Sequence, residues 1–326
     1  MKAVLCKSFG PPESLVLEEV VDPQPAAGQV VIDVHACAIN FPDVLMIQDK
    51  YQFKPPLPFS PGAEVAGVVS AVGADVAGLS VGDRVLASPG WGGLAEKAAV
   101  NAASVIPVPG EIDLIHASAF LYAYGTSQYA LKDRAKLQPG ETLLVLGAAG
   151  GVGLAAVELG VQMGASVIAA ASSDSKLDLC REYGAAMTIN YASEDLRQRL
   201  KDLTGGAGVD VVYDPVGGSY SEPALRSMAW NGRFLVIGFA AGDIPKLPLN
   251  LTLLKGCSIV GVFWGAFVGR EPDRHRQNVA ELMQWWGEGR LRPHVSATYP
   301  LERSAEAIRA LADRTAKGKV VVTIGD

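Results

Sequence analysis

The alternation of apolar and polar positions changes character along the chain. Up to about residue 110, short apolar runs alternate with turns rich in proline and glycine, a spacing typical of strands in a partly closed barrel or a sandwich. The predicted strands of this first region are residues 3–6, 16–20, 30–38, 65–72, 84–87 and 95–100. No long helical pattern separates them, so we expect a mostly β domain.

From about residue 113 the period becomes helical, and after residue 140 apolar strand patterns alternate with helical ones. The predicted strands are residues 142–146, 166–171, 187–190, 209–213, 233–238 and 257–262. The predicted helices include residues 126–134, 152–163, 175–183, 194–203 and 220–229. Such alternation predicts a parallel sheet with right-handed crossovers, and six strands match the doubly wound dinucleotide-binding fold.

The last sixty or so residues return to a mixed pattern, with helices expected at 278–286 and 305–314 and strands at 295–299 and 319–324. This tail is too short for a domain of its own, so we expect it to complete the first domain. The predicted fold class is therefore α/β, with a doubly wound parallel six-stranded Rossmann sheet inserted in a discontinuous β-rich domain. The expected domains are residues 1–120 with 266–326, and residues 121–265.

The stretch from Thr142 to Met163 reads as a buried strand, a glycine-rich turn and a helix. Glycines let the backbone turn tightly, and a helix that begins in such a turn points N–H groups and a positive dipole end at a ligand, which suits a pyrophosphate. Ala148 replaces the first glycine of the usual three, so a turn that only packs a helix is the alternative. The strand–turn–helix context favours a dinucleotide site at Gly150, Gly151, Val152 and Gly153.

The end of the next predicted strand bears on the choice of cofactor. NAD-specific folds carry an acidic residue there, whereas this chain has Ala171, Ser172 and Ser173. Lys176 lies one turn into the following helix and could reach a 2′-phosphate. An ordinary capped helix start is the alternative reading, and Asp174 fits a cap. We predict NADPH as the cofactor.

Charge and composition exclude several classes of function. A formal net charge of −6 over 326 residues gives no sign of a nucleic-acid partner. No apolar run approaches the ~18 residues of a membrane span, and the first ten residues are too polar for a signal peptide, so we expect a cytoplasmic protein with no membrane partner. The four cysteines form no C-x-x-C pair. His35 and Cys37 would share one strand face, but we expect no metal.

Candidates for acid–base chemistry lie in an irregular segment from Asn40 to Gly62 that contains five prolines. Asn40 and Asp43 are three residues apart and would share a face of a helical turn. Tyr51 precedes a rigid Pro55-Pro56 pair that could hold its hydroxyl over a cleft. Local capping by Asp43 and simple packing of Tyr51 are the structural alternatives.

Six motifs resemble those of one family: Asn40-Phe41-Pro42-Asp43, Pro61-Gly62-Ala63-Glu64, Val81-Gly82-Asp83-Arg84-Val85, Gly147-Ala148-Ala149-Gly150-Gly151-Val152-Gly153, Ile189-Asn190-Tyr191 and Asp214-Pro215-Val216-Gly217-Gly218. Together they resemble the medium-chain dehydrogenase/reductase superfamily, in its zinc-free, zeta-crystallin-like quinone oxidoreductase branch with a GroES-like domain. Zinc-dependent alcohol dehydrogenases carry metal ligands where this chain has Asn40 and Ala63. Without them, Lewis-acid alcohol oxidation is not available.

The resemblance also implies roles for single residues. Ser172, Lys176 and Tyr191 would surround the 2′-phosphate, and Phe239 and Phe263 would lie near the nicotinamide. Asn40, Asp43 and Tyr51 would face the substrate, with Tyr51 as the proton donor of related enoyl-thioester reductases. A homodimer would form through the strand from Cys257 to Val262, which would also cover an apolar sheet edge.

Three functions are consistent with these features. The first is an NADPH-dependent, metal-independent reduction of a quinone. The second is reduction of an activated C=C bond in an enone, enal or enoyl-thioester, with Tyr51 as proton donor. The third is a non-catalytic NADPH-binding protein, because the superfamily includes lens crystallins and membrane-traffic proteins.

Overall fold

The chain crosses between two structural units twice in the computed structural model, which describes residues 1–325. The first unit joins Met1–Tyr122 to the segment from Pro293 onward, and the second is Ala123–Arg292. Within the described residues, no helix is both long enough and apolar enough to cross a membrane.

The return to the first unit comes later than the boundary expected after residue 265. Helices α9 (Trp264–Arg270) and α10 (Pro272–Gly287) belong to the second unit. Two polar contacts hold α10 there: Lys132 Nζ donates to Glu281 at 2.5 Å in an exposed position, and Asn278 Nδ2 donates to Asp133 at 2.7 Å in a half-buried one. The amphipathic pattern of α10 correctly indicated a helix but could not say which unit it packs against.

The first unit contains most of the predicted strands and one that was not predicted, β7. Its elements are β1 (Lys2–Leu5), β2 (Val16–Glu19), β3 (Gln29–Ile39), α1 (Phe41–Met46), β4 (Glu64–Val72), β5 (Arg84–Ala87), β6 (Lys97–Asn101), β7 (Val105–Pro107), α2 (Leu114–Ser118), β14 (Val295–Pro300), α11 (Ser304–Ala312) and β15 (Lys319–Thr323), with short 3-10 turns at Pro12–Ser14, Ala102–Ser104 and Leu301–Arg303. The C-terminal tail completes this unit, as expected.

Strand β3 organises the first unit. The sheet order is β14-β15-β3-β4-β5-β7, with β6 also paired to β3, while β1 and β2 form a separate pair. β4 runs along one side of β3, and the other side is shared by β6 and β15. β-branched residues such as Val30, Ile32 and Val34 suit this central position and are buried in the core.

The prediction that His35 and Cys37 share a face of this strand is wrong. The pairing of β3 with β4 shifts register between Val34 and Ala36, which is a β-bulge at His35. A bulge inserts one residue and so breaks the two-residue alternation of side chains. His35 is exposed, whereas Cys37 is fully buried.

The second unit is the predicted Rossmann fold. Its elements are α3 (Leu121–Gln128), a π-helix at Tyr129–Arg134, β8 (Thr142–Leu146), α4 (Gly151–Gln162), β9 (Ser166–Ala171), α5 (Asp174–Glu182), β10 (Met187–Asn190), α6 (Leu196–Leu203), β11 (Val209–Asp214), a 3-10 turn at Gly218–Tyr220, α7 (Ser221–Arg226), β12 (Met228–Val236), α8 (Asn250–Lys255) and β13 (Ser258–Gly261), followed by α9 and α10. The helix expected over 220–229 ends early because β12 already begins at Met228. The helix expected over 126–134 turns into the π-helix after Gln128.

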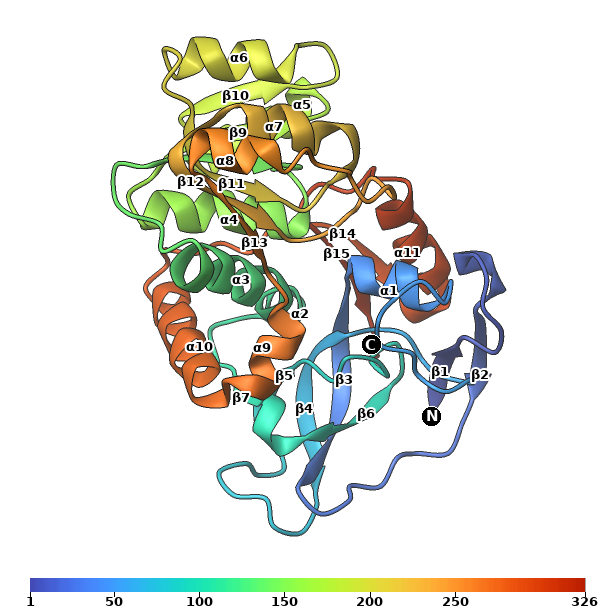
Figure 1. The fold of residues 1–326 in the computed structure, drawn as a ribbon. Helices are drawn as coiled ribbons and strands as arrows, with labels where there is room; N and C mark the ends of the chain where they lie inside the picture. Colours follow the sequence, from blue (N-terminus) through green and yellow to red (C-terminus); the bar gives the residue numbers. More distant parts are fainter. Residues whose placement is uncertain (326) are drawn as a thin grey trace. The chain divides into compact units, whose positions relative to one another are not determined.

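Six parallel strands in the order β10-β9-β8-β11-β12-β13 form the sheet of this unit, and helices lie along it (Figure 1). Leu144 and Ile168 pack in one cluster with residues of α6, α7 and α8. On the other face, α4 is so close that a side chain at Gly160 would meet Leu143 and Val167. Both faces are therefore covered, which explains strands without polar alternation.

Candidate active site and cofactor-binding turn

The first candidate residues meet where β3 ends and α1 begins. Asn40 caps α1, and its backbone N–H donates to the Asp43 carboxylate at 2.8 Å. The backbone N–H of Gly62 donates to the other oxygen of the same carboxylate at 3.0 Å. The structure thus brings Asn40 and Asp43 together, as their spacing predicted. Asp43 fastens the loop before β4 to the start of α1.

Burial governs the chemistry of Asp43. Its side chain is fully buried, and this raises the pKa of the carboxyl from 3.8 to about 6, although the two backbone N–H groups act in the opposite direction. Both oxygens already accept from the backbone. These contacts favour the local structural reading of Asp43, which the sequence had left open beside direct chemistry.

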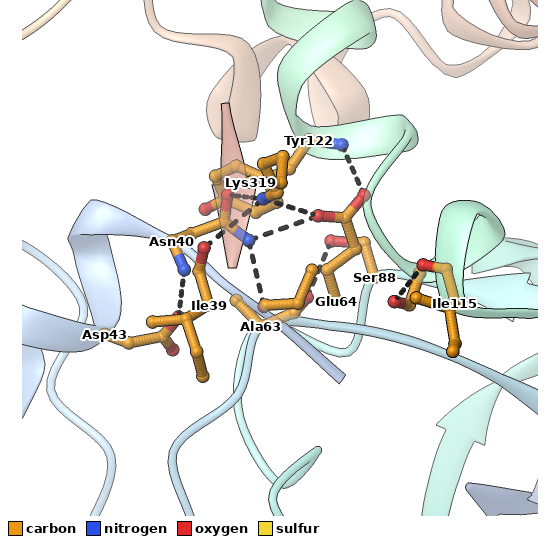
Figure 2. A network of polar contacts seen from close by, with 11 residues as sticks. Ile39, Asn40, Asp43, Ala63, Glu64, Ser88, Ile115, Tyr122 and Lys319 are labelled. Atoms are coloured by element: carbon orange, nitrogen blue, oxygen red, sulfur yellow. Dashed lines mark hydrogen bonds and ion pairs between the residues drawn. The ribbon is translucent and has the colours of Figure 1, made fainter. Parts of the chain in front are cut away.

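Glu64 is the centre of a buried polar network beside Asn40 (Figure 2). The Lys319 ammonium donates to Asn40 Oδ1 at 2.5 Å, to Glu64 Oε2 at 3.2 Å and to the Ile39 carbonyl at 3.4 Å. Asn40 Nδ2 donates to Glu64 Oε2 at 3.2 Å and to the Ala38 carbonyl at 3.3 Å. The Asn40 amide and Glu64 Oε2 could have bound a substrate, but they already form hydrogen bonds within the protein.

Strand register explains why these residues meet. β15 pairs antiparallel with β3, with Val320 opposite Ile39, so Lys319 arrives beside Asn40. β3 in turn pairs with β4, with Ala38 opposite Glu64. Sequence reasoning missed Lys319, which lies 279 residues from Asn40. The only local signal of this role was a lysine at the start of a strand that is otherwise mostly apolar, with the sequence KVVVT.

Tyr51 lies beside a second tyrosine. The hydroxyls of Tyr51 and Tyr122 are hydrogen-bonded to each other, and the Tyr51 ring makes an edge contact with Phe53 at 5.9 Å between centroids. Burial raises the pKa of Tyr51 and raises that of Tyr122 well above its usual value. Tyr122 is itself tied to the network, because its backbone N–H donates to Glu64 Oε1 at 2.8 Å.

The predicted glycine turn lies at the carboxyl end of β8 in the second unit. Gly147 has φ +58°, which favours glycine, and Gly150 is the N-cap of α4 with no side-chain cap among the described residues. A Cβ at Gly153 would lie 2.2 Å from the Gly147 carbonyl oxygen and 2.9 Å from Ala148 Cα. Gly153 therefore lets the start of α4 pack directly against the turn. The first backbone N–H groups of α4 then lie at the turn, where they could bind a pyrophosphate.

Replacing Gly153 with alanine is expected to force the turn apart, because a backbone carbonyl cannot move aside as a flexible side chain can. We expect a loss of about 1–3 kcal/mol in the free energy of unfolding and at least about a tenfold rise in the Kd for dinucleotide. Denaturant unfolding and fluorescence titration measure the two effects. Gly287→Ala, at a helix end with open space around it, should change neither Kd nor fold. A Gly153→Ala protein with wild-type affinity would contradict the close-packed turn.

A second turn follows β11, the strand next to β8. The buried Asp214 carboxylate accepts from the backbone N–H groups of Val216 and Gly217 at 2.9 and 2.8 Å, and from the Ser221 hydroxyl at 2.6 Å. Phe239 packs against Gly217, whose φ is +70°. The two turns flank the point where the strand order reverses, which is where open α/β sheets bind ligands.

The residues predicted around a 2′-phosphate lie at the ends of β9 and β10. Lys176 Nζ donates to Ser172 Oγ at 3.4 Å. The Asp174 carboxylate accepts from Asn190 Nδ2 at 2.9 Å, and Ser173 rather than Asp174 is the N-cap of α5. Tyr191 packs on Tyr220 at 4.3 Å between ring centroids and lines a pocket of about 610 Å³. Phe263, the N-cap of α9, is 46% exposed.

The residues around Glu64 do not fit a metal ion. The donor set is one carboxylate and one amide already held by an ammonium, and a second cation at the same atoms would be repelled by Lys319. Within residues 1–325, no group of three or more histidine, cysteine, aspartate or glutamate side chains is arranged to hold a metal.

Comparison with known proteins agrees with this architecture. Two family models match, the alcohol dehydrogenase GroES-like domain at residues 26–110 and the zinc-binding dehydrogenase at residues 151–285. The quinone oxidoreductase-like protein 2 homolog of Nematostella vectensis is 40% identical over 324 residues, which cover 98% of this chain and 88% of the relative.

Two solved structures are similar along their whole length. Escherichia coli quinone oxidoreductase complexed with NADPH is 28% identical, with a TM-score of 0.93 and coverage of 99% of this chain and 100% of that one. The CurK enoyl reductase is also 28% identical, with a TM-score of 0.89 and coverage of 99% of each chain. These matches favour an enzyme over the non-catalytic alternative.

The motifs, the inserted Rossmann unit and the near-complete coverage of a relative at 40% identity lead to one assignment. The family models carry zinc enzymes in their descriptions, but this chain has Asn40 and Ala63 where those enzymes carry metal ligands. The chain is an oxidoreductase and belongs to the zinc-free quinone oxidoreductase branch of the medium-chain dehydrogenase/reductase superfamily.

Proposed function

We propose that this protein uses NADPH to reduce a quinone without a metal ion. The observation that carries the proposal is the donor set around Glu64, where Lys319 and Asn40 occupy the carboxylate that would otherwise be available to a metal. The named relatives are a quinone oxidoreductase-like protein 2 homolog and, among solved structures, the Escherichia coli quinone oxidoreductase complexed with NADPH. The cofactor is NADPH.

The second unit has the features that NADPH requires. The amides at the start of α4 and the close-packed Gly153 suit the pyrophosphate. Ser172, Lys176 and Tyr191 would hold the 2′-phosphate, and no carboxylate ends β9 to repel it. Asp174 is engaged with Asn190, which supports the view that it does not oppose the phosphate. Phe239 and Phe263 would border the nicotinamide end.

Replacing Lys176 with alanine should weaken NADPH binding by about 1.5–3 kcal/mol, or roughly 10- to 150-fold, because a charge-assisted hydrogen bond to the phosphate is lost. NADH lacks that phosphate, so its affinity should hardly change. Fluorescence titration with both nucleotides measures the difference. Lys201→Ala, on α6 of the same unit, serves as the control for loss of a surface charge. Equal losses for NADPH and NADH would overturn the phosphate role of Lys176.

When bound, NADPH supplies the hydride, and the protein supplies position and a proton source. A quinone accepts the hydride at an electron-poor carbonyl system, and the resulting hydroquinone oxygen takes its proton readily from water. Quinone reduction therefore places little demand on a protein acid. In this reaction Tyr51 and the network around Asn40 would mainly shape and orient the acceptor site.

A second candidate, reduction of an activated C=C bond, is favoured by one specific observation. The Tyr51 hydroxyl is hydrogen-bonded to the Tyr122 hydroxyl, so a phenol that is able to donate a proton is held in position beside Asn40 and Asp43 in the sequence. A saturated carbon needs a proton delivered to a defined atom, unlike a hydroquinone oxygen. The structural similarity to the CurK enoyl reductase supports this alternative.

We further propose a homodimer formed through β13, the edge strand of the Rossmann sheet. Ile259 on this strand is exposed, and so are large apolar side chains of the segments that precede it in the chain: Trp230, Ile244, Leu249, Leu253 and Leu254. Strand pairing across a two-fold axis would cover Ile259 and the free edge. Sedimentation velocity that showed a 34.1 kDa monomer at micromolar concentration would contradict this proposal. A cytoplasmic location stays a prediction from the sequence.

A further inference from the structure

A side-chain hydrogen bond joins the loops that follow β9 and β10. Asn190 Nδ2 donates to Asp174 Oδ1 at 2.9 Å. In the sequence, Asp174 lies between Ser172 and Lys176, two of the residues proposed to hold the 2′-phosphate. We propose, on the basis of that NADPH site, that Asn190 is a specificity-determining residue: it holds the Asp174 carboxylate at the end of β10, where it neither pairs with Lys176 nor binds the ribose of NADH.

Strand register brings the two side chains together. β9 and β10 are parallel neighbours, and Asn190, the last residue of β10, is opposite Ala171, the last residue of β9. Asp174 is the first acidic residue after the end of β9. NAD-specific folds use an acidic residue near this place to bind the ribose 2′-hydroxyl. Asp174 is therefore the group in this loop that would favour NADH if nothing restrained it.

The orientation of the Asn190 amide is fixed by the turn that it begins. Its Oδ1 accepts from the backbone N–H of Ala192 at 3.2 Å, and its own backbone N–H donates to Glu194 Oε1 at 2.8 Å. Because Oδ1 is held by a donor, the amide presents Nδ2 to Asp174. A flipped amide would place its oxygen against the carboxylate and its NH2 group against the Ala192 N–H, and both hydrogen bonds would be lost.

The same contact restrains Asp174. A carboxylate only accepts hydrogen bonds, so a fixed donor determines where it lies. Asn190 supplies that donor from the end of β10, whereas Lys176 Nζ donates to Ser172 Oγ at 3.4 Å, beside the end of β9. The structure thus gives the acidic side chain of this loop a neutral partner on the neighbouring strand.

A carboxylate released from Asn190 would act on the two nucleotides in opposite directions. A phosphate monoester carries about −1.5 to −2 charges at pH 7, so a free Asp174 would repel it and would compete with it for the Lys176 ammonium. The ribose 2′-hydroxyl of NADH could instead donate to the same carboxylate. The Asp174 side chain is exposed, so solvent screens these effects and they should be moderate in size.

The test compares the Kd of NADPH with that of NADH by fluorescence titration of the full-length protein. In Asn190→Ser, the hydroxyl could still accept from the Ala192 N–H, as serine does in such turns, but it is too short to reach Asp174. Asn190→Leu is a second variant with no polar group. Asp174→Asn removes the charge. Asp178→Asn is its control, because Asp178 is an exposed aspartate one turn further along α5 that pairs with Arg181.

We expect both Asn190 variants to lower the ratio of Kd for NADH to Kd for NADPH by about three- to tenfold. Asp174→Asn should change this ratio little by itself and should abolish the effect of the Asn190 variants in double mutants. Asp178→Asn should abolish nothing. If Asn190 only stabilised the fold, its variants would weaken both nucleotides together and leave the ratio unchanged.

An unchanged ratio in the Asn190 variants would overturn the proposal, as would a lowered ratio that persists when Asp174→Asn is added. If one Asn190 variant does not fold, the other decides the result. The titrations need no electron acceptor, so they do not depend on whether the protein reduces a quinone or a C=C bond. If Lys176→Ala loses NADPH selectively and the Asn190 variants do not, the phosphate site stands and only the role of Asn190 fails.

Discussion

Replacing Lys319 with methionine is expected to lower the free energy of unfolding by about 3–5 kcal/mol. The ammonium is 6% exposed and its partner carboxylate on Glu64 is not exposed at all. Without the lysine, Glu64 becomes a buried charge with only neutral donors, while Asn40 Oδ1 loses its partner. Urea unfolding of both proteins measures the loss.

The same experiment has an internal control in the surface ion pair between Lys2 and Glu302, at 3.8 Å with both side chains about half exposed. Lys2→Met should cost no more than about 1 kcal/mol, because solvent already screens that pair. Combining Lys319→Met with Glu64→Gln should recover part of the loss, since the unpaired charge is then gone. A Lys319→Met protein within about 1 kcal/mol of wild type would contradict the ion-pair assignment.

Replacing Tyr51 with phenylalanine should lower kcat on an enone or enal by about 100-fold or more, the usual contribution of a positioned general acid. Turnover of a quinone should fall only slightly, because a hydroquinone oxygen takes its proton from water. The ratio of the two kcat changes, measured by NADPH absorbance on one protein preparation, separates a lost proton donor from a disturbed fold.

Phe53→Leu is the matched control for that variant, because Phe53 touches the Tyr51 ring and is 48% exposed but carries no hydroxyl. Its effect on the two acceptors should be similar and small. If Tyr51→Phe reduced an enone as fast as wild type, Tyr51 would not be the donor, and the C=C alternative would lose the observation that favours it.

The Rossmann unit could be derived almost completely from the sequence because its signals are local. Strand β8, the turn through Gly147 and Gly153 and helix α4 follow one another within about twenty residues, and each has its own apolar period. Prediction was less accurate at the ends of elements, as at α7, which ends at Arg226 because β12 already begins at Met228.

The candidate site was harder because its contacts are long-range. Asn40 and Asp43 could be paired from their spacing, but the meeting of Lys319 with Glu64 depends on the register of three strands. The bulge at His35 likewise comes from pairing and not from any local pattern. Sequence reasoning gave Tyr122 no role, because only the structure shows that its hydroxyl meets the hydroxyl of Tyr51.

The most direct test of the proposed function is steady-state oxidation of NADPH by the purified, metal-chelated protein with a panel of quinones, enones, enals and enoyl-thioesters. We expect turnover with at least one quinone or activated alkene, no loss of activity on chelation, and a clear preference for NADPH over NADH. Tight binding of NADPH with no oxidation by any acceptor in the panel would contradict it.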